Sequence, residues 1–517
     1  MNFQLHRPLG FTGKGDRFLQ AAARDLKKML IDVKNPLTYK MLCLSNKTLG
    51  ELAGVLIEFA EDIHNDIGIW KSFEQYNLEF FGTRLPLTSH PDHDIGQSAM
   101  NPYRIRHLLW VLYSELQPDV ILSPTHQDLC ILAERISPFL KDRFAQIPRE
   151  SGVKKFLAQQ NRFGWDVKRK LVWLGQHSYL FRHSYQNYVE EHGGKYDITT
   201  TDDFVCQATT SWSGLGVTDI LASALHITEK QRSTLRSWYE RHAAYYKILA
   251  VKSPIMKVLN IINDKPYTIR VEEERTQFKP HHVVFGSLVP WNGEWYWSGT
   301  QLAWSDVPEE DIQQLKEEFL RGAPRIAYRY CQQLAIRARE RTRVHYDEFV
   351  GYHGDDLAIY PDGHSLAADK QKKYRLKYER QPKEVVSQVL KRHNLPHPWP
   401  RMSFPDQLLE CDNGVAVYCN RDEGEEIMQE FNHIANGLRK KGINLSEEEE
   451  NSIRGFVYSD AISPQFVRKL VQKYGEESIA VAFLIRSDHD TSCLDYLLRR
   501  YKGHFYKKRY PYISFAF

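Results

Sequence analysis

The first half of the chain carries apolar residues at the three- and four-residue spacing of amphipathic helices. One such series covers residues 14–80, and further helices are expected at Arg104–Leu116 and Asp128–Phe144. Thr228 is an expected N-cap, because its hydroxyl oxygen can accept a hydrogen bond from the first turn of a helix. The helix that Thr228 begins is expected to reach about Ala250. The N-terminal 255 residues are therefore predicted to be helical.

The period of the pattern changes to two after Met256, which indicates strands. Asn292-Gly293 joins the last two of these strands, and both residues of such a turn need positive φ, so a β-hairpin is expected. A small antiparallel β-barrel of SH3-like or OB-like type, or a curled sheet, is predicted here. The four strands are Lys257–Ile262, Tyr267–Val271, His282–Val289 and Trp295–Ser298.

Helical spacing returns after the strands. Pro308 is expected to begin a long helix that reaches about Arg343. Ser446 with Glu449 makes a capping box, and Ser463 is an N-cap followed by proline at the first helical position. The other expected elements are a strand at Leu357–Tyr360, a polar helix at 366–380, a strand at Val415–Tyr418 and a helix at Glu423–Lys441.

These patterns predict an α+β fold that is predominantly helical and multi-domain, since 517 residues are too many for one core. The β-module is expected in the middle of the sequence, with a helical C-terminal domain. The expected regions are a helical N-terminal domain (1–90), a second helical region (91–255), the antiparallel β-module (256–310), a basic helical region (311–395) and a mainly helical C-terminal domain with a basic aromatic tail (396–517).

Cysteine usage and hydropathy favour a cytoplasmic protein. The seven cysteines are scattered and none forms a CxxC pair, so a disulfide framework is not expected. The N-terminus lacks the apolar core of a signal peptide, and no apolar run approaches the ~18 residues of a membrane span. Around Ser213 the sequence is Ser-Trp-Ser-Gly-Leu-Gly, which is neither GxSxG nor a P-loop.

Positive charge is concentrated in two regions. Residues 321–383 hold fourteen lysines and arginines against eight acidic residues, and residues 496–517 hold six against none. The remaining chain is therefore acidic overall, although the total net charge is +4. A local excess of charge attracts a polyanion whatever the total is.

Aromatic residues accompany this charge. The hairpin has three tryptophans, Trp291, Trp295 and Trp297; the last two share a face and either fill the barrel or form a stacking platform, which leaves Trp291 as the expected surface ring. Cations beside exposed rings predict binding of nucleic acid, with RNA or single strands preferred because stacking needs unpaired bases. The predicted contact residues are Trp291, Arg325, Arg329, Arg337, Arg341, Lys373, Arg375, Lys377, Arg499, Arg500, Tyr501, Lys507, Lys508 and Arg509.

Two alternatives remain open from the sequence. The first is a metal-dependent hydrolase, such as a nuclease, because two loops cluster the imidazole and carboxylate ligands that a divalent metal needs. The second is a protein-interaction scaffold whose basic tail docks on an acidic partner or on the acidic part of the chain itself. No other cofactor is expected. The candidate metal ligands are His90, His93, Asp94, His345, Asp347 and His353.

Overall fold

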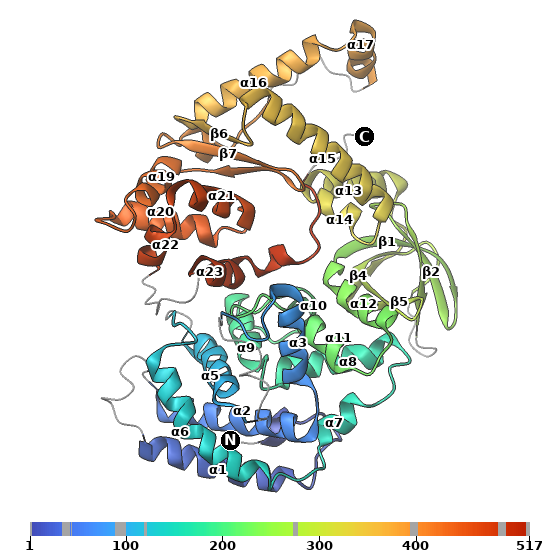
Figure 1. The fold of residues 1–517 in the computed structure, drawn as a ribbon. Helices are drawn as coiled ribbons and strands as arrows, with labels where there is room; N and C mark the ends of the chain where they lie inside the picture. Colours follow the sequence, from blue (N-terminus) through green and yellow to red (C-terminus); the bar gives the residue numbers. More distant parts are fainter. Residues whose placement is uncertain are drawn as a thin grey trace. The chain divides into compact units, whose positions relative to one another are not determined.

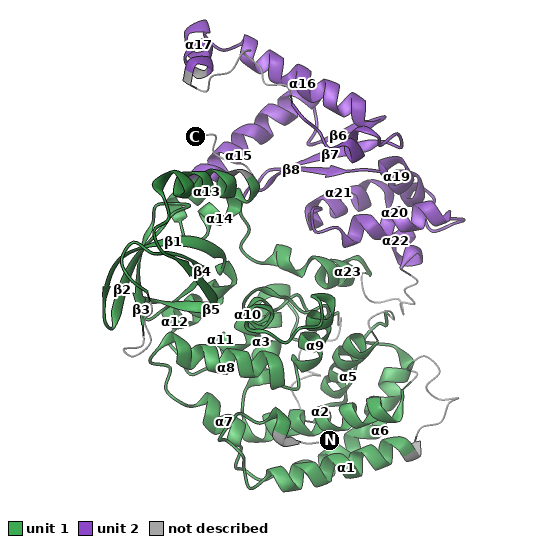
Figure 2. Cartoon of the chain, turned by 180° about the vertical axis from the view of Figure 1, so that it is seen from behind, with its two compact units in different colours: residues 1–336, 485–510, 514–517 green, residues 337–484, 511–513 purple. Residues whose placement is uncertain are grey.

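The computed structural model describes residues 3–33, 42, 44–87, 100–117, 121–271, 278–392, 402–483 and 493–512. It confirms a mostly helical α+β chain with a five-stranded barrel in the middle of the sequence (Figure 1). The chain forms two compact units (Figure 2). Unit 1 comprises residues 1–336, 485–510 and 514–517, and unit 2 comprises residues 337–484 and 511–513. The five regions expected from the sequence remain a prediction.

The N-terminal part of unit 1 is a set of helices, some of which begin at a polar N-cap residue. Leu26, Leu56 and Leu108 are fully buried on the faces that the helical spacing predicts. The Ser45 and Asn101 side chains accept hydrogen bonds at two of the helix N-termini. The helices are α1 (Asp16–Val33), α2 (Asn46–Asn65), α3 (Ile69–Phe81), α5 (Pro102–Leu116), α6 (Gln127–Phe144), α7 (Gly152–Leu157), α8 (Gly164–His177), α9 (Arg182–Glu191), α10 (Ile198–Gln207), α11 (Val217–Ala224) and α12 (Glu229–Arg236).

The barrel of unit 1 is closed, with the strand order β1-β2-β3-β5-β4. This is the Greek-key order of an OB-like barrel, one of the two types that the sequence favours. The predicted antiparallel pairing holds for every pair except β3 and β5, which are parallel at Ile269 and Trp295. Asn292 and Gly293 both have positive φ, as the predicted hairpin turn requires. The strands are β1 (Ala243–Lys252), β2 (Ile255–Asn260), β3 (Pro266–Arg270), β4 (Val283–Trp291) and β5 (Glu294–Trp304).

The helix expected to run from Thr228 to Ala250 is wrong in its second half. Thr228 does cap α12, but the helix ends at Arg236 and the chain then forms β1. Alternate residues of β1, Ala244, Tyr246 and Ile248, point into the barrel and are buried. Pairing with both β2 and β4 therefore decides the conformation of this segment.

The long helix expected from Pro308 to Arg343 is also wrong, because it is broken twice. α13 (Glu309–Gly322) ends before Pro324, which begins the short helix α14 (Pro324–Tyr328). α15 (Gln332–His353) then crosses from unit 1 into unit 2. Proline at the first helical position can begin a helix but cannot continue one, so the first break falls where the sequence places Pro324.

Unit 2 contains a three-stranded antiparallel sheet in the order β6-β7-β8. Its strands β6 (Leu357–Tyr360) and β7 (Val415–Asn420) confirm two predictions, and both predicted caps, Ser446 and Ser463, are present. The remaining elements of unit 2 are α16 (Gly363–Glu379), α17 (Lys383–Arg392), α18 (Asp406–Leu409), β8 (Gly424–Met428), α19 (Phe431–Arg439), α20 (Glu447–Tyr458), α21 (Pro464–Tyr474) and α22 (Glu477–Ala482).

The helix predicted at Glu423–Lys441 begins later than expected. Residues 424–428 form strand β8 instead, and α19 begins only at Phe431. The buried Glu426 carboxylate holds this strand in place, because it accepts hydrogen bonds from the Ser463 backbone N–H and the Asn420 side chain. Both partners lie outside residues 423–441, so local helix propensity does not decide the conformation of residues 424–428.

Among the residues that the structure describes, we find no helix with the length and apolar character needed to cross a membrane.

Candidate anion-binding pocket

The prediction that Trp291 lies on the surface is wrong. Trp291 is fully buried, and its indole N–H donates to the Asn161 backbone carbonyl at 2.9 Å. Trp295 and Trp297 of the same hairpin remain half-buried, although each packs edge-on against a core tyrosine, Tyr267 or Tyr246. Trp291 therefore has no face to offer a base.

The basic tail is neutralised by carboxylates from elsewhere in unit 1, although residues 496–517 contain no acidic residue. In unit 1 it follows α23 (Cys493–Lys502), and Lys507 pairs with the buried carboxylate of Asp219. Lys508 pairs with Glu240 at 2.6 Å, and the Tyr510 hydroxyl donates to the same carboxylate. The tail thus docks on acidic residues of its own chain.

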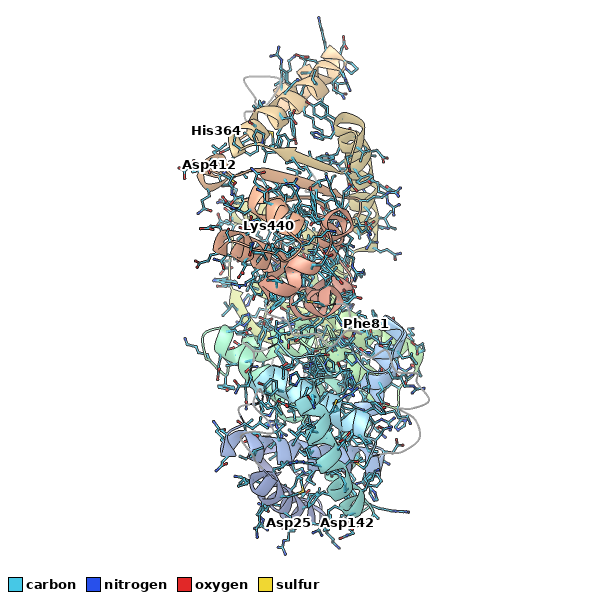
Figure 3. The ribbon with its side chains drawn as sticks, turned by 60° about the vertical axis from the view of Figure 1, so that its left-hand side comes forward. Asp25, Phe81, Asp142, His364, Asp412 and Lys440 are labelled. Atoms are coloured by element: carbon cyan, nitrogen blue, oxygen red, sulfur yellow. The ribbon has the colours of Figure 1, made fainter. Side chains whose placement is uncertain are left out.

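Rings and tyrosine hydroxyls occupy the other cations of this segment. The Arg499 guanidinium lies 3.8 Å from the centre of the Phe81 ring, which Figure 3 labels, and Arg509 lies 3.9 Å from Phe505. Arg500 donates to the hydroxyls of Tyr496 and Tyr501 at 3.0 and 3.2 Å. These contacts replace water around each guanidinium and leave little of it for a ligand.

The four arginines predicted on α14, α15 and the turn between them differ in exposure. Arg325 and Arg329 are half-buried in unit 1, where Arg329 donates to the Arg241 carbonyl at 2.7 Å. Arg337 and Arg341 lie exposed on the part of α15 that belongs to unit 2. The sequence grouped all four by charge, and the structure divides them between the units.

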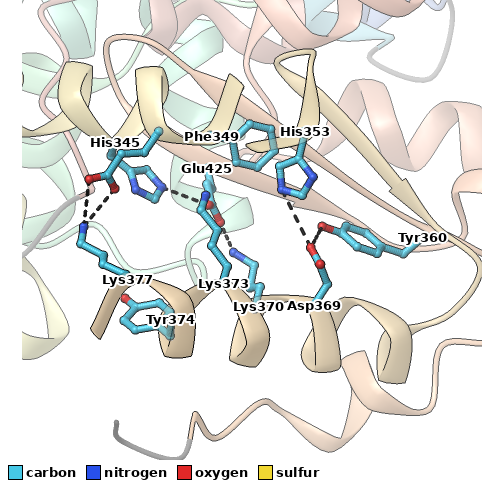
Figure 4. A pocket seen from close by; sticks show the side chains of 11 residues that line it. His345, Phe349, His353, Tyr360, Asp369, Lys370, Lys373, Tyr374, Lys377 and Glu425 are labelled. Carbon is cyan, nitrogen blue, oxygen red and sulfur yellow. Dashed lines mark hydrogen bonds and ion pairs between the residues drawn. The ribbon is translucent and has the colours of Figure 1, made fainter. Parts of the chain in front are cut away.

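A pocket of unit 2 lies between α15 and α16, with Glu425 of β8 at its base (Figure 4). Its volume is about 50 Å³, which is room for a small group such as a phosphate but not for a nucleoside. Side chains four residues apart line it from both helices. They are His345, Phe349 and His353 on α15, and Asp369, Lys373 and Lys377 on α16.

The carboxylates of this pocket all have partners. Glu425 accepts a hydrogen bond from His345 at 2.9 Å and pairs with Lys370. Burial opposes ionisation of Glu425, yet these two partners lower its pKa to about 2. Glu348 pairs with Lys377 at 2.9 Å.

The Asp369 carboxylate also has hydrogen-bond partners. It accepts hydrogen bonds from the hydroxyls of Tyr352 and Tyr360, both at 2.8 Å, and lies 3.9 Å from His353. Burial lowers the pKa of His353, which favours the neutral imidazole at pH 7.

Lys373 is the exception. Its Nζ atom is buried and has no hydrogen-bond partner among the described residues. It lies 4.8 Å from the centre of the Phe349 ring and 5.9 Å from that of Tyr352. Burial lowers the pKa of Lys373 by more than the nearby Glu425 carboxylate raises it. A buried ammonium without an acceptor is costly, so an anion entering this pocket would stabilise it.

The other predicted residues of this region fall outside the pocket or are paired. Arg375 pairs with Glu379 at 2.8 Å on the exposed side of α16. Asp347 is exposed and does not line the pocket.

The predicted metal ligands do not assemble in the part of the chain that is described. His345 and His353 line one pocket, but each faces its own carboxylate, and the described residues hold no group of three or more side chains placed to bind a metal. His90, His93 and Asp94 lie outside the described residues. The nearby Asp355 and Asp356 pair with Lys469 instead.

Sequence reasoning missed Glu425, Asp369 and Phe349 as members of the site. Asp369, Lys373 and Lys377 recur every four residues, and so do His345, Phe349 and His353; this spacing places each set on one helix face. The two sets together could have indicated facing helices. Glu425 gave no such signal, because its strand was predicted to be a helix.

Residues 46–200 match the model of a family described as a protein of unknown function, DUF3843. The match covers less than half of the chain and lies within unit 1, so it does not include the pocket. No curated protein and no solved structure matches the chain.

Proposed function

We propose that the chain binds nucleic acid, with RNA or single strands preferred, through α15, α16 and α17 of unit 2. The observation that supports this most directly is the buried Lys373 ammonium without a partner. A phosphate oxygen carries the negative charge and the lone pairs that this group lacks. Residues 499–509 of the tail are not expected to bind nucleic acid, because carboxylates and aromatic rings already contact their cationic side chains.

The charge around the pocket suits a polyanion. Residues 363–392 contain nine lysines and arginines and three acidic residues, a net charge of +6. Lys372 and Lys377 are exposed on α16 and Arg380 directly after it, and Arg337 and Arg341 are exposed on α15. Phosphates bound along such a surface release counterions, so the affinity should fall as salt is raised.

Two exposed rings stand beside the pocket. Tyr352 on α15 and Tyr374 on α16 keep 37% and 43% of their surface accessible. An aromatic face can stack on an unpaired base, and a duplex offers no such base along its length. This favours a single strand over a duplex.

We also infer a cytoplasmic location. Five cysteines described in the structure, Cys130, Cys206, Cys331, Cys411 and Cys419, form no disulfide, as expected of a reducing compartment.

Lys373→Met is expected to weaken binding of a fluorescein-labelled oligouridine about tenfold, since a charge-assisted contact contributes on the order of 1.5 kcal/mol. The slope of log affinity against log salt should fall by about 0.7, the loss of one single-strand phosphate contact. Fluorescence anisotropy across a salt series measures both. The folded protein should be no less stable, because methionine removes an unpartnered ammonium and packs well against the rings of Phe349 and Tyr352.

The matched control is Lys473→Met, which removes an exposed lysine of α21 in the same unit. It should leave both affinity and slope close to those of the unaltered protein. Binding that does not depend on salt, or that is equal in the Lys373→Met and Lys473→Met variants, would remove the proposal.

A further inference from the structure

A second candidate site lies in unit 1, on the barrel. Two cavities, of about 290 and 740 Å³, share Lys168 of α8 and Trp297 of β5 among their lining residues. Both cavities border the same two side chains, and the surface that lines them along α8, α10 and β5 is the candidate site. We name it the Trp297 groove.

The cations of the Trp297 groove are neutralised. Lys168 pairs with the Asp202 carboxylate and donates to the Ser298 hydroxyl at 3.0 Å. Arg270 makes a two-pronged pair with Glu294, with both N–O distances at 2.6 Å. A phosphate would find no unpaired cation at either residue, so the charge of this groove favours an uncharged ligand.

Aromatic rings and small polar groups share the lining. Trp165 and Tyr296 meet edge-to-face at 5.3 Å, and the Phe278 ring lies 6.1 Å from that of Trp297. Tyr196, at the α10 side, keeps 67% of its surface exposed. The remaining lining is rich in hydroxyl and amide groups, from Thr199, Thr201, Thr300, Gln176 and Gln301.

Trp297 also supplies a donor without an acceptor. Its indole nitrogen is buried and has no hydrogen-bond partner in the described part of the chain. A buried N–H left unpaired is costly, and an acceptor oxygen that reached this nitrogen would remove that cost. The same side chain offers an apolar ring face beside this donor.

We propose that the Trp297 groove binds a neutral oligosaccharide. A sugar ring has an apolar C–H face that stacks on an indole, and its hydroxyl groups both donate and accept hydrogen bonds. The groove supplies rings, an indole N–H without a partner, and threonine hydroxyl and glutamine amide groups, of which Gln176 donates to Thr201 at 3.1 Å and Gln301 donates to the Gly299 carbonyl. An extended peptide would find no free strand edge on the barrel, because each of its five strands is already paired with two neighbours.

The test titrates the full chain with cellohexaose, maltohexaose and chitohexaose, and follows tryptophan fluorescence and heat release. At least one of the three is expected to saturate at millimolar concentration or below. Trp297→Phe should weaken that binding at least tenfold, since it removes the donor and part of the ring. Trp304→Phe, at the end of the same strand and outside the groove, should leave it unchanged.

Lys373→Met should also leave sugar binding unchanged, which separates this site from the one in unit 2. Thermal unfolding of Trp297→Phe shows whether its fold is intact; should it unfold early, Gln301→Ala replaces it as the test variant. The proposal is overturned if none of the three sugars saturates, if the groove variant binds as well as Trp304→Phe, or if oligouridine displaces the bound sugar.

Discussion

Asp202→Asn is expected to lower the free energy of unfolding of unit 1 by about 3–5 kcal/mol, the usual cost of removing one partner from a buried ion pair. The Asp202 side chain is 4% exposed and lies between Lys168 of α8 and Arg241, which precedes β1. It also accepts a hydrogen bond from Ser298 of β5 at 2.6 Å. One carboxylate therefore joins two helices to the barrel, and asparagine would leave two cations without their shared counter-charge. Urea unfolding followed by circular dichroism measures the loss.

The loss of unfolding free energy in Asp202→Asn should depend on pH. Burial alone would raise the pKa of Asp202, but Lys168 and Arg241 outweigh it and hold the pKa below its ordinary value. A carboxyl group whose pKa is lowered by folding stabilises the protein above the unfolded pKa of about 3.9 and loses that contribution as the pH falls through the folded pKa. The difference between the Asp202→Asn variant and the unaltered protein should thus be full at pH 7 and narrow below about pH 4.

Asp203→Asn is the matched control. Asp203 also pairs with Arg241, at 2.6 Å, but its side chain is 38% exposed and water can replace it. Its loss should cost no more than about 1 kcal/mol. Equal effects of the two variants would show that Asp202 does not hold the network together.

Gly363→Ala is expected to destabilise unit 2 by about 3 kcal/mol, at the upper end of the usual cost of overpacking. Gly363 begins α16, and a Cβ atom there would lie 1.7 Å from the Leu408 carbonyl oxygen and 2.7 Å from its carbon. Both are backbone atoms that cannot rotate away. The Gly363 N–H also donates to the Cys411 carbonyl at 2.8 Å, and a shift of the helix start would break that bond.

The consequence should extend to ligand binding. Gly363 fixes the start of the helix that carries Lys373, so a displaced α16 would weaken oligouridine binding as well as stability. Thermal unfolding and anisotropy measure the two effects. Gly351→Ala is the control, because Gly351 lies within α15 with open space around it. Alanine there should raise the free energy of unfolding by about 0.5–1 kcal/mol. A Gly363→Ala variant as stable as Gly351→Ala would contradict the close approach.

Features decided within a few residues were predictable from the sequence. The caps at Thr228, Ser446 and Ser463 are examples, since each needs only a hydroxyl and the next three backbone positions. The Asn292-Gly293 turn is another, because it depends on the φ values that those two residues tolerate.

Features decided by distant partners were not predictable. The tail of residues 507–510 looked unneutralised, because Asp219 and Glu240 are 288 and 268 positions away from Lys507 and Lys508. Strand β1 was taken for a helix because only its neighbours in the barrel distinguish the two.

The candidate pocket shows the same division. Lys373 and Lys377 were selected for their charge, and their spacing placed them on one helix face. Nothing in the sequence indicated that Lys377 faces Glu348 while Lys373 faces only rings. That difference makes Lys373 the informative residue, and it depends on how α15 and α16 pack together.

The docked tail bears on the order in which the chain folds during synthesis. Unit 1 includes residues 485–510, which the ribosome makes only after the whole of residues 337–484. Until then Asp219 and Glu240 lack Lys507 and Lys508 as partners. Residues 337–484, the main segment of unit 2, can therefore pack on the nascent chain before unit 1 receives its final segment.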